Sequence, residues 1–270
     1  MPAIRSVKTL AIIGAGAAGL VTAKTLLARG YSCTVFERSQ ALGGVWAAGY
    51  SNFGLQVQRE LYEFPDFPHQ PDTPDFTPGE QVQQYLERFG VWPTIRFDTS
   101  VTNVSKAPDG AGWKLTLEHD GAMRDERFDF VVVCTGLFSN KPHMPSFPGQ
   151  DNFAGEIIHV SALRHREQLT NKKVAVVGFG KSASDAALES AATATNTLLV
   201  FREVHWPVPT KLLELLPFKW AMLNRLTSTL LPPYYRPSML ERCLHSLGRP
   251  LVWLWWRLVE LLLIAQFGLG

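Results

Sequence analysis

The sequence is poor in cysteine, with three in 270 residues. Cys33, Cys134 and Cys243 lie far apart and are odd in number, which excludes both a disulfide framework and a C-x-x-C pair for metal or redox chemistry. No cluster of metal-ligating side chains stands out either, so we expect no metal site. Unpaired cysteines fit a reducing compartment, and we therefore expect a cytoplasmic protein.

An excess of one charge is also lacking, because 26 basic residues face 24 acidic ones and leave a formal net charge of +2. Such a balance gives no electrostatic reason to expect a nucleic acid or an acidic partner. Hydrophobic residues make up 46% of the chain and charged residues 19%, a globular composition large enough for one or two domains. A small or neutral ligand is the better expectation. The composition leaves the oligomeric state unknown.

Long apolar runs are scarce. The run near the N-terminus is too short for the core of a signal peptide, so we expect no export signal. Residues 251–267 are mostly Leu, Val, Trp and Ile, but Arg257 and Glu260 interrupt them near the middle. Two charges at that depth disfavour a helix that spans a membrane. We expect a helix that is buried or that lies on a membrane surface.

The stretch Thr9–Glu37 has the pattern of a strand, a glycine turn, a helix and a second strand. Gly14 permits the tight turn, Gly16 lets the backbone approach a pyrophosphate, and Gly19 lets the helix pack closely on the strand. The N-terminus of such a helix offers unpaired N–H groups to phosphates. Glu37 stands where a carboxylate binds both hydroxyls of an adenosine ribose and disfavours a 2′-phosphate. The stretch therefore predicts a site for FAD or NAD.

Two later glycine turns are expected beside this first cofactor. An L-G-G-x-W turn at residues 42–46 stands where a flavoprotein lets backbone run along the phosphates and the flavin ring. Residues 128–134 form a continuous apolar run typical of a central parallel strand, and the glycine after it either lets backbone approach a cofactor or simply ends the strand. The expected contacts are Gly14, Gly16, Ala17, Ala18, Gly19, Glu37, Arg38, Gly44, Val45, Trp46, Thr135 and Gly136.

A second fingerprint occupies residues 173–183, where an apolar strand again leads into a glycine turn and an alanine-rich helix. An alanine replaces the third glycine, which the motif tolerates. The following strand ends in Arg202, where the first unit has Glu37. An arginine there pairs with a 2′-phosphate and favours NADPH, although Glu203 beside it leaves a solvated arginine as an alternative. The expected contacts are Gly178, Gly180, Lys181, Ser182, Ala183 and Arg202.

These patterns predict an α/β fold with two Rossmann-like dinucleotide-binding domains. We expect an FAD-binding domain over residues 1–150, with a small antiparallel β insertion at about 91–127, where turn signals separate short alternating runs. Residues 151–270 then form an NADPH-binding domain and a C-terminal apolar helical segment. Two dinucleotide sites in one chain predict two cofactors that meet, and the simplest chemistry is hydride transfer from NADPH to FAD.

The stretch Phe153-Ala-Gly155-Glu-Ile-Ile-His159 resembles the F-x-G-x-x-x-H signature of class B flavoprotein monooxygenases. The order of the other motifs fits too: G-A-G-A-A-G, L-G-G-x-W, V-V-C-T-G, this signature and G-x-G-x-S-A. Over nearly all of its length the chain is similar to flavin-containing monooxygenases of the dimethylaniline-monooxygenase type. Leu163 stands where the signature has an aromatic residue, which makes a Baeyer–Villiger enzyme the less expected branch.

The resemblance implies that NADPH reduces FAD and that oxygen adds to give a C4a-hydroperoxyflavin. This species passes an oxygen atom to a small organic substrate such as an amine or a sulfide. Gln56 takes the position of an asparagine that lies near the reactive flavin edge in many family members, so it is the catalytic candidate. His159 is expected to hold the junction between the two domains.

Family members continue well past an equivalent of Gln266, and the resemblance implies that this further part completes the FAD domain and walls the substrate pocket. Two alternatives to a monooxygenase therefore stay open. One is an NADPH-dependent flavin reductase or dehydrogenase without oxygenation. The other is an inactive, truncated fragment that keeps both nucleotide sites.

Overall fold

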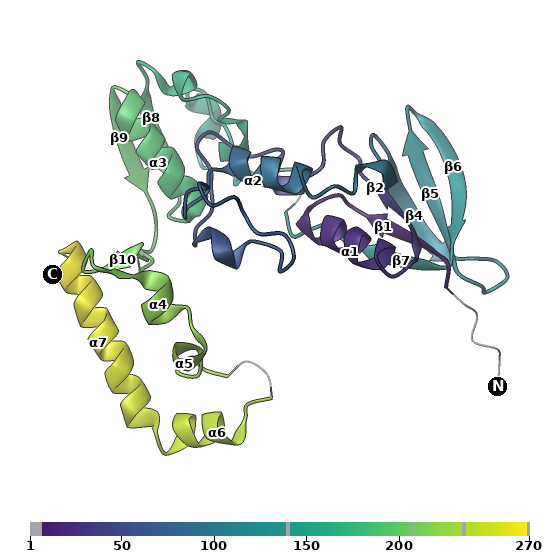
Figure 1. Ribbon diagram of the computed structural model, residues 1–270. Helices are drawn as coiled ribbons and strands as arrows, with labels where there is room; N and C mark the ends of the chain where they lie inside the picture. The colour runs from purple at the N-terminus through teal and green to yellow at the C-terminus, as the bar shows by residue number, and fades with distance from the viewer. Residues whose placement is uncertain (1–6, 139–140, 207, 234–235, 269–270) are drawn as a thin grey trace. The chain divides into compact units, whose positions relative to one another are not determined.

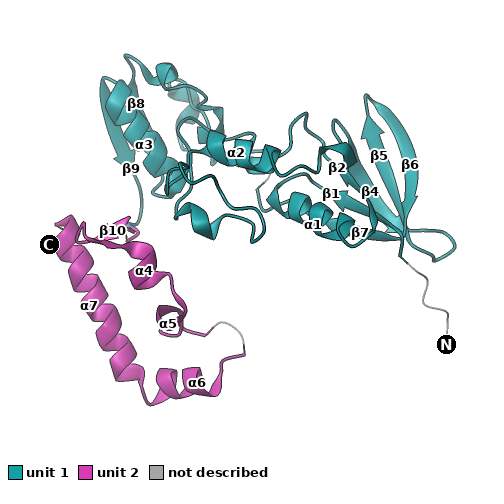
Figure 2. Cartoon of the chain, in the orientation of Figure 1, with its two compact units in different colours: residues 1–204 teal, residues 205–270 magenta. Residues whose placement is uncertain are grey.

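The computed structural model describes residues 7–138, 141–206, 208–233 and 236–268 (Figure 1). The chain divides into two compact units, residues 1–204 and 205–270 (Figure 2). Both predicted fingerprints therefore lie in unit 1. A domain boundary at residue 150 stays a prediction.

The first fingerprint folds into one parallel sheet with a helix beside it. Strands β1 and β2 are in register from Thr9 opposite Ser32 to Ile13 opposite Phe36. This arrangement confirms the predicted α/β class and its first Rossmann-like unit. The elements are β1 (Thr9–Ile13), α1 (Ala17–Leu27), β2 (Ser32–Phe36), β3 (Ile95–Arg96) and β7 (Phe130–Val133), and the strand order is β3-β2-β1-β7.

The prediction that residues 128–134 form a central strand is wrong in position. β7 pairs in parallel with β1 as expected, but it is the last strand of the sheet in the described part of the chain. Phe130 and Val133 are accordingly 50% and 66% exposed. Phe128 belongs to the preceding strand, β6. A continuous apolar run indicates burial on both faces, yet it cannot show whether a further strand pairs with the outer edge.

The two faces of the first sheet bury different side chains, because successive residues of a strand point to opposite faces. Ile12 and Val35 pack in the main core with α1 and with helix α2 (Gly79–Glu87). Ala11 and Phe36 pack on the other face against Leu115. Helices therefore cover one face of the sheet and the β insertion covers the other.

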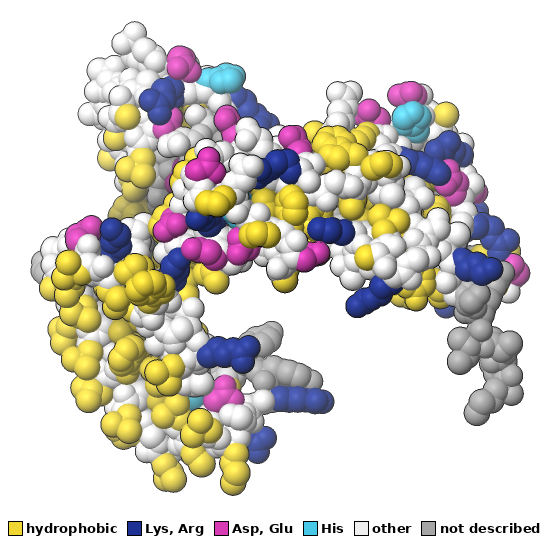
Figure 3. Space-filling view, viewed as in Figure 1, with side chains coloured by type: hydrophobic (Ala, Val, Ile, Leu, Met, Phe, Trp, Pro, Cys, Tyr) yellow, Lys and Arg dark blue, Asp and Glu magenta, His cyan; other side chains and the backbone are white. Residues whose placement is uncertain are grey.

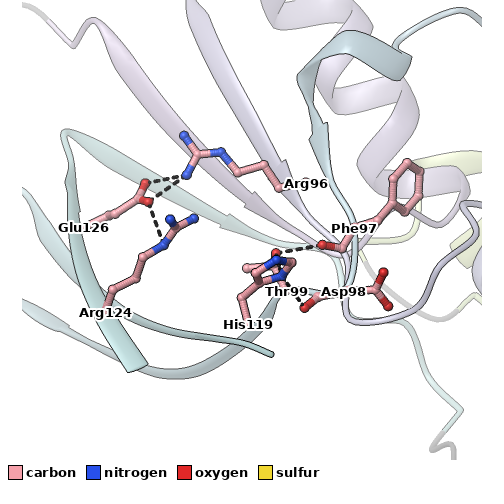
Figure 4. Close-up of polar contacts among 7 residues, drawn as sticks. All are labelled: Arg96, Phe97, Asp98, Thr99, His119, Arg124 and Glu126. Atoms are coloured by element: carbon pink, nitrogen blue, oxygen red, sulfur yellow. Dashed lines mark hydrogen bonds and ion pairs between the residues drawn. The ribbon is translucent and has the colours of Figure 1, made fainter. Parts of the chain in front are cut away.

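The predicted antiparallel insertion is present as a three-stranded sheet in the order β4-β5-β6. Its strands are β4 (Ser100–Lys106), β5 (Trp113–His119) and β6 (Ala122–Phe128). Figure 4 shows how polar contacts fix it beside the parallel sheet. Arg96 of β3 donates from Nη1 to both carboxylate oxygens of Glu126, at 2.7 and 2.8 Å. The Nδ1 atom of His119 lies 2.9 Å from the carbonyl oxygen of Asp98, just before β4.

The second fingerprint also folds as predicted, with a parallel strand pair around a helix. Strand β8 (Lys173–Val177) leads into α3 (Lys181–Thr193), and β9 (Asn196–Val200) returns beside β8. Val174 and Val176 of β8 pack on a small core beneath α3. In the described part of unit 1, the connections carry six short 3-10 helices: η1 (Gly44–Trp46), η2 (Arg59–Leu61), η3 (Trp92–Thr94), η4 (Gln150–Asn152), η5 (Val160–Ala162) and η6 (Arg166–Leu169).

The junction segment, residues 48–52, ties the first half of unit 1 to α3. Asn52 donates from Nδ2 to Glu189 Oε1 at 2.9 Å, and Ser51 Oγ lies 3.5 Å from Glu189 Oε2. Arg166 contributes a third contact, at 3.1 Å, to the same carboxylate. Because the Glu189 side chain is only 4% exposed, these three side chains take the place of water as partners of its carboxylate.

The described residues of unit 2 form a short hairpin and four helices. Gln266 ties the end of the last helix to the hairpin, since its Nε2 donates to the Lys211 carbonyl at 2.9 Å and its Oε1 accepts from Leu213 N at 3.0 Å. Trp256 donates from Nε1 to the carbonyl oxygen of Leu230 at 3.0 Å. The elements are β10 (Lys211–Leu212), β11 (Leu216–Pro217), α4 (Phe218–Met222), α5 (Arg225–Ser228), α6 (Met239–Ser246) and α7 (Arg249–Phe267).

Helix α7 confirms that residues 251–267 are helical, but the expectation of burial is wrong. Val259 and Leu263 are its buried residues, and the space-filling view shows hydrophobic side chains over the unit that contains it (Figure 3). Within the described residues it is the helix long and apolar enough to cross a membrane, with 11% of its apolar window buried. A helix with this many apolar side chains can bury only one side of itself against a unit this small.

We expect Glu189→Ala to lower the free energy of unfolding by about 2 kcal/mol, because a buried hydrogen bond to a charged group is worth more than a neutral one. The contribution of Arg166 is the smaller part, since that side chain is 55% exposed and water replaces its lost partner. Urea denaturation at neutral pH measures the change. Glu167→Ala removes an exposed carboxylate next to Arg166 and should change the free energy of unfolding by less than about 0.5 kcal/mol. Equal losses in the two variants would contradict a special role for the junction segment.

Candidate functional site

The first glycine turn is built so tightly that two of its glycines cannot carry a side chain. Gly14 has φ of +103°, and a Cβ on it would lie 2.5 Å from the carbonyl oxygen of Cys134 at the end of β7. A Cβ on Gly19 would lie 1.9 Å from the carbonyl oxygen of Gly14. Helix α1 therefore presses on the turn, and the turn presses on the end of β7. This is the close packing predicted for the first and third glycines of the fingerprint.

The N-terminus of α1 is open toward the position that the fingerprint assigns to phosphates. Gly16 is the N-cap, has extended backbone, and gives the helix no side-chain cap. The nearest atom to a Cβ built on Gly16 is the Cα of Gly44, at 3.9 Å. Ala17 and Ala18 supply the first N–H groups of the helix. These donors and the helix dipole make the end of α1 suited to an anion.

The L-G-G-x-W turn lies directly against the first turn. Gly43 donates its N–H to the carbonyl oxygen of Ala15 at 2.9 Å, which places Gly44 beside Gly16. Trp46 is partly buried and stacks on Phe53, with ring centroids 5.6 Å apart. Val45 is 49% exposed. Two segments distant in the sequence thus form one glycine-lined surface at the start of α1.

Glu37 lies at the same edge, where β2 ends. Its side chain is buried, and Oε2 accepts the backbone N–H of Ala15 at 2.8 Å. Oε1 accepts from the backbone N–H of Ser39 at 3.0 Å and from its hydroxyl at 2.8 Å. The carboxylate therefore helps to fix the backbone of the first glycine turn through its hydrogen bond with Ala15. Each carboxylate oxygen can accept more than one hydrogen bond, so the group retains acceptor capacity for a ribose hydroxyl.

The remaining candidates of the first site are placed less closely. The Cα of Thr135 lies 3.6 Å from the position of a Cβ built on Gly14, so the chain just after β7 contacts the turn. Gly136 follows with φ of +77°. Arg38 is exposed beside Glu37, and Gln56 is exposed on the turn after Leu55. For these residues, as for every other residue predicted to contact a cofactor, the contact itself stays a prediction.

The second glycine turn repeats the geometry of the first with more room. Gly178 has φ of +124°, and a Cβ on it would lie 3.4 Å from the Cβ of Ala183. The methyl group of Ala183 therefore faces the side of Gly178 that carries no side chain. Gly180 is the N-cap of α3, has extended backbone and provides no side-chain cap. The first turn of α3, which includes Lys181 and Ser182, therefore presents a second open helix N-terminus.

Two basic side chains flank this second turn in different ways. Gly178 donates its N–H to the carbonyl oxygen of Val200 at 2.8 Å, so the end of β9 lies against the turn. Arg202 follows β9 and is exposed. Lys181 forms an ion pair with Asp185 one helical turn along α3. Its ammonium group is thus already held at the start of the helix.

Sequence reasoning missed the polar residues that join the two turns. Tyr50 donates its hydroxyl to Asp185 Oδ2 at 2.7 Å. The pKa of Tyr50 is raised to about 12, mainly by burial and also by the hydrogen bond to Asp185, while a hydrogen bond with Ser182 acts to lower it. The tyrosine is therefore a neutral donor at physiological pH. The available signal was the spacing of Asp185 and Glu189, two carboxylates on one face of an otherwise alanine-rich helix.

His159 has a local role in the structure. Its Nδ1 accepts the backbone N–H of Ser161 at 3.2 Å, so the ring caps the short helix η5. The next residues, Leu163 and Arg164, contact the junction segment. This agrees with the expectation that His159 serves the connection between the two halves rather than chemistry.

Comparison with known proteins covers unit 1 and continues into unit 2. The family model described as flavin-binding monooxygenase-like matches residues 7–233. Flavin-containing monooxygenase 1 of Canis lupus familiaris is 36% identical, over 71% of this chain and 40% of that protein. Flavin-containing monooxygenase 5 of Cavia porcellus is 32% identical, over 89% of this chain and 50% of that protein. The chain thus spans half or less of the length of these curated relatives.

Solved structures give the same answer. The S-allyl-L-cysteine S-oxygenase of Allium sativum superposes with a TM-score of 0.66 at 30% identity, over 76% of this chain and 54% of that one. A steroid monooxygenase bound to NADP superposes with a TM-score of 0.62 at 26% identity, over 76% of this chain and 40% of that one. Since the family model covers residues 7–233 and the fold agrees, the chain belongs to the flavin-binding monooxygenase-like family.

Proposed function

We propose that this chain binds FAD at the first glycine turn and NADPH at the second, and that it serves the NADPH-dependent oxygenation of a small organic substrate by O2. One observation carries the proposal. Helices α1 and α3 of unit 1 each begin after a glycine turn and without a side-chain cap. Glu37 follows the second strand of the first fingerprint, and Arg202 follows the second strand of the second fingerprint. Such paired sites suit two dinucleotides that exchange electrons.

The first site favours FAD because its acidic residue is already aimed at the turn. Glu37 reaches Ala15 N–H, and a nearby dianionic 2′-phosphate would be repelled by this carboxylate. The glycine-lined surface around Gly16 and Gly44 leaves room for a pyrophosphate. Val45 and Trp46 continue from that surface, which makes them the candidates beside the flavin ring. Gln56 is the candidate for a hydrogen bond at the reactive edge of that ring.

The second site favours NADPH because two cations flank an open helix N-terminus. Lys181 stands at the first helical position of α3, and Arg202 follows the strand that lies against Gly178. A guanidinium binds a phosphate bidentately, which suits Arg202 to the 2′-phosphate. The backbone N–H groups of residues 181–183 suit the pyrophosphate.

The chemistry that follows divides between the cofactors and the chain. When bound, FAD accepts a hydride from NADPH and passes electrons to O2. The residues of this chain bind, orient and keep the two dinucleotides at a fixed separation through the junction segment. The substrate class we propose is a soft nucleophile, an amine or a sulfide. A structural relative that is an S-oxygenase supports the sulfide arm of this choice.

We also propose that α7 lies on a membrane surface, on the cytoplasmic side. Seven of its apolar side chains are at least 40% exposed: Leu251, Trp253, Leu254, Leu258, Leu261, Leu262 and Phe267. Arg257 and Glu260 form an ion pair on the helix, which keeps charge at an interface rather than within a hydrocarbon core. Cysteines that are all free agree with a reducing environment.

The cofactor proposal predicts a defined spectral sequence. The purified chain should show the visible absorbance of bound oxidised flavin, which bleaches on addition of NADPH without oxygen. Admitting oxygen should give a long-lived absorbance before the oxidised spectrum returns. Immediate return with stoichiometric peroxide would instead favour a flavin reductase. A chain that retains no flavin after reconstitution would contradict both and favour a fragment without an FAD site.

Arg202→Ala tests the assignment of the second dinucleotide. We expect the KM for NADPH to rise by roughly tenfold or more, since a charge-assisted bidentate contact is lost. The KM for NADH should change little, because NADH has no 2′-phosphate. Arg29→Ala, which changes an exposed arginine just after α1 that is assigned to neither site, is the matched control and should leave both values unchanged. An equal rise for NADPH and NADH would refute the role of Arg202.

The membrane proposal predicts that the chain cosediments with vesicles of phosphatidylcholine and phosphatidylserine. The double variant Leu254→Glu and Leu258→Glu should stay in the supernatant, because it places two charges on the apolar face. Leu188→Glu changes a leucine of α3 that is 70% exposed, and it should sediment like the wild type. Unchanged sedimentation of the double variant would show that α7 does not mediate binding.

A further inference from the structure

The junction segment is anchored on both sides of Tyr50. Before it, Arg164 donates from Nη1 to the carbonyl oxygens of Ala48 and Gly49, at 3.1 and 2.6 Å. After it, Ser51 donates its N–H to the carbonyl oxygen of Leu163 at 2.7 Å. Backbone and guanidinium contacts thus fix the chain on either side of the tyrosine. These contacts therefore hold the Tyr50 hydroxyl beside α3.

At that place the hydroxyl meets a carboxylate that also binds a lysine. Asp185 Oδ2 accepts from Tyr50 at 2.7 Å, and the same oxygen pairs with Lys181 Nζ. The Asp185 side chain is 14% exposed, so little water competes for it, whereas Lys181 is 33% exposed and can reach a ligand. The three groups form a chain from the junction segment to the first residue of α3. Lys181 follows Gly180, the uncapped N-terminal residue of that helix.

The fixed hydroxyl determines where the ammonium group can lie. Lys181 has a long, flexible stem, and an isolated lysine–carboxylate pair on a helix surface fixes its geometry weakly. Asp185 is set by a second, neutral donor on a rigid segment, so its oxygen has a defined position. The ammonium group that pairs with this oxygen is then kept at the helix N-terminus, where the helix dipole and open N–H groups attract phosphate.

We propose that Tyr50, acting through Asp185, is a positioning residue that holds Lys181 for the pyrophosphate of the bound nicotinamide dinucleotide. The inference rests on the proposed function, since it assumes that the second turn binds NADPH. It also gives the two cations of that site different tasks. Lys181 serves the pyrophosphate, which NADP+ and NAD+ share, and Arg202 serves the 2′-phosphate, which only NADP+ carries. The junction segment begins two residues after Trp46 of the first site, so one short stretch of chain serves both dinucleotides.

The test is a double-mutant cycle read by calorimetric binding of NADP+ and NAD+ to the full chain. Tyr50→Phe removes only the hydroxyl, and Lys181→Met removes the charge while keeping the stem. We expect Tyr50→Phe to raise the Kd of NADP+ and NAD+ by the same factor, roughly three- to tenfold, as for coupled neighbours. In the Lys181→Met background the same change should have no further effect. Tyr31→Phe alters a tyrosine that is 37% exposed and should match the wild type.

The outcomes separate the two proposals. If the wild type binds neither dinucleotide, the NADPH site itself is wrong and the inference falls with it. If the wild type binds both and Tyr50→Phe binds them equally well, the inference alone is wrong. A loss that persists in full with Lys181→Met, or one confined to NADP+, would also overturn it. Should Tyr50→Phe melt below the assay temperature, Asp185→Asn replaces it, and its loss of affinity must again require Lys181.

Discussion

The close approach of backbone to backbone at the first glycine turn is the constraint on which the structure depends. The carbonyl oxygen of Gly14 occupies the space where a Cβ on Gly19 would lie, at 1.9 Å, and the end of β7 closes on Gly14 from the other side. Only with both positions free of side chains can α1 begin directly at the edge of the parallel sheet. This contact helps to set the position of the open N-terminus of α1. Glu37 and the L-G-G-x-W turn at Gly44 both hydrogen-bond or pack beside it.

The same architecture is used twice in unit 1, with a difference that the packing explains. In the first copy, α1 lies so close that glycine is required at the third position. In the second copy, a Cβ built on Gly178 would lie 3.4 Å from the Cβ of Ala183, which is an ordinary van der Waals contact. The looser turn carries a lysine at its first helical position, and that lysine is steadied by side chains from outside the fingerprint. Tight packing and side-chain support are thus alternative ways to shape a phosphate site.

Unit 2 differs from unit 1 in how its apolar surface is used. The first parallel sheet and helix of unit 1 enclose a core in which Ile12, Leu20 and Val35 are fully inaccessible. In unit 2 the apolar window of helix α7 is only 11% buried, with Val259 and Leu263 as its buried residues. An exposed apolar surface of this extent is a feature of proteins that meet a membrane or another apolar surface. The carboxylate and guanidinium on α7 pair with each other, which lets the helix lie at an interface.

The sequence by itself determined both fingerprints, because glycine spacing, an apolar strand and a closing acidic or basic residue are local features that few other structures require. It also determined the antiparallel insertion and the helix at residues 251–267. Only the tertiary structure decided that β7 is an edge strand, since strand order depends on partners far away in the chain. It likewise brought Tyr50 to Asp185 and Asn52 to Glu189, across more than a hundred positions of sequence. No local pattern encodes such pairs, because they join segments far apart in the sequence that meet only in the folded chain.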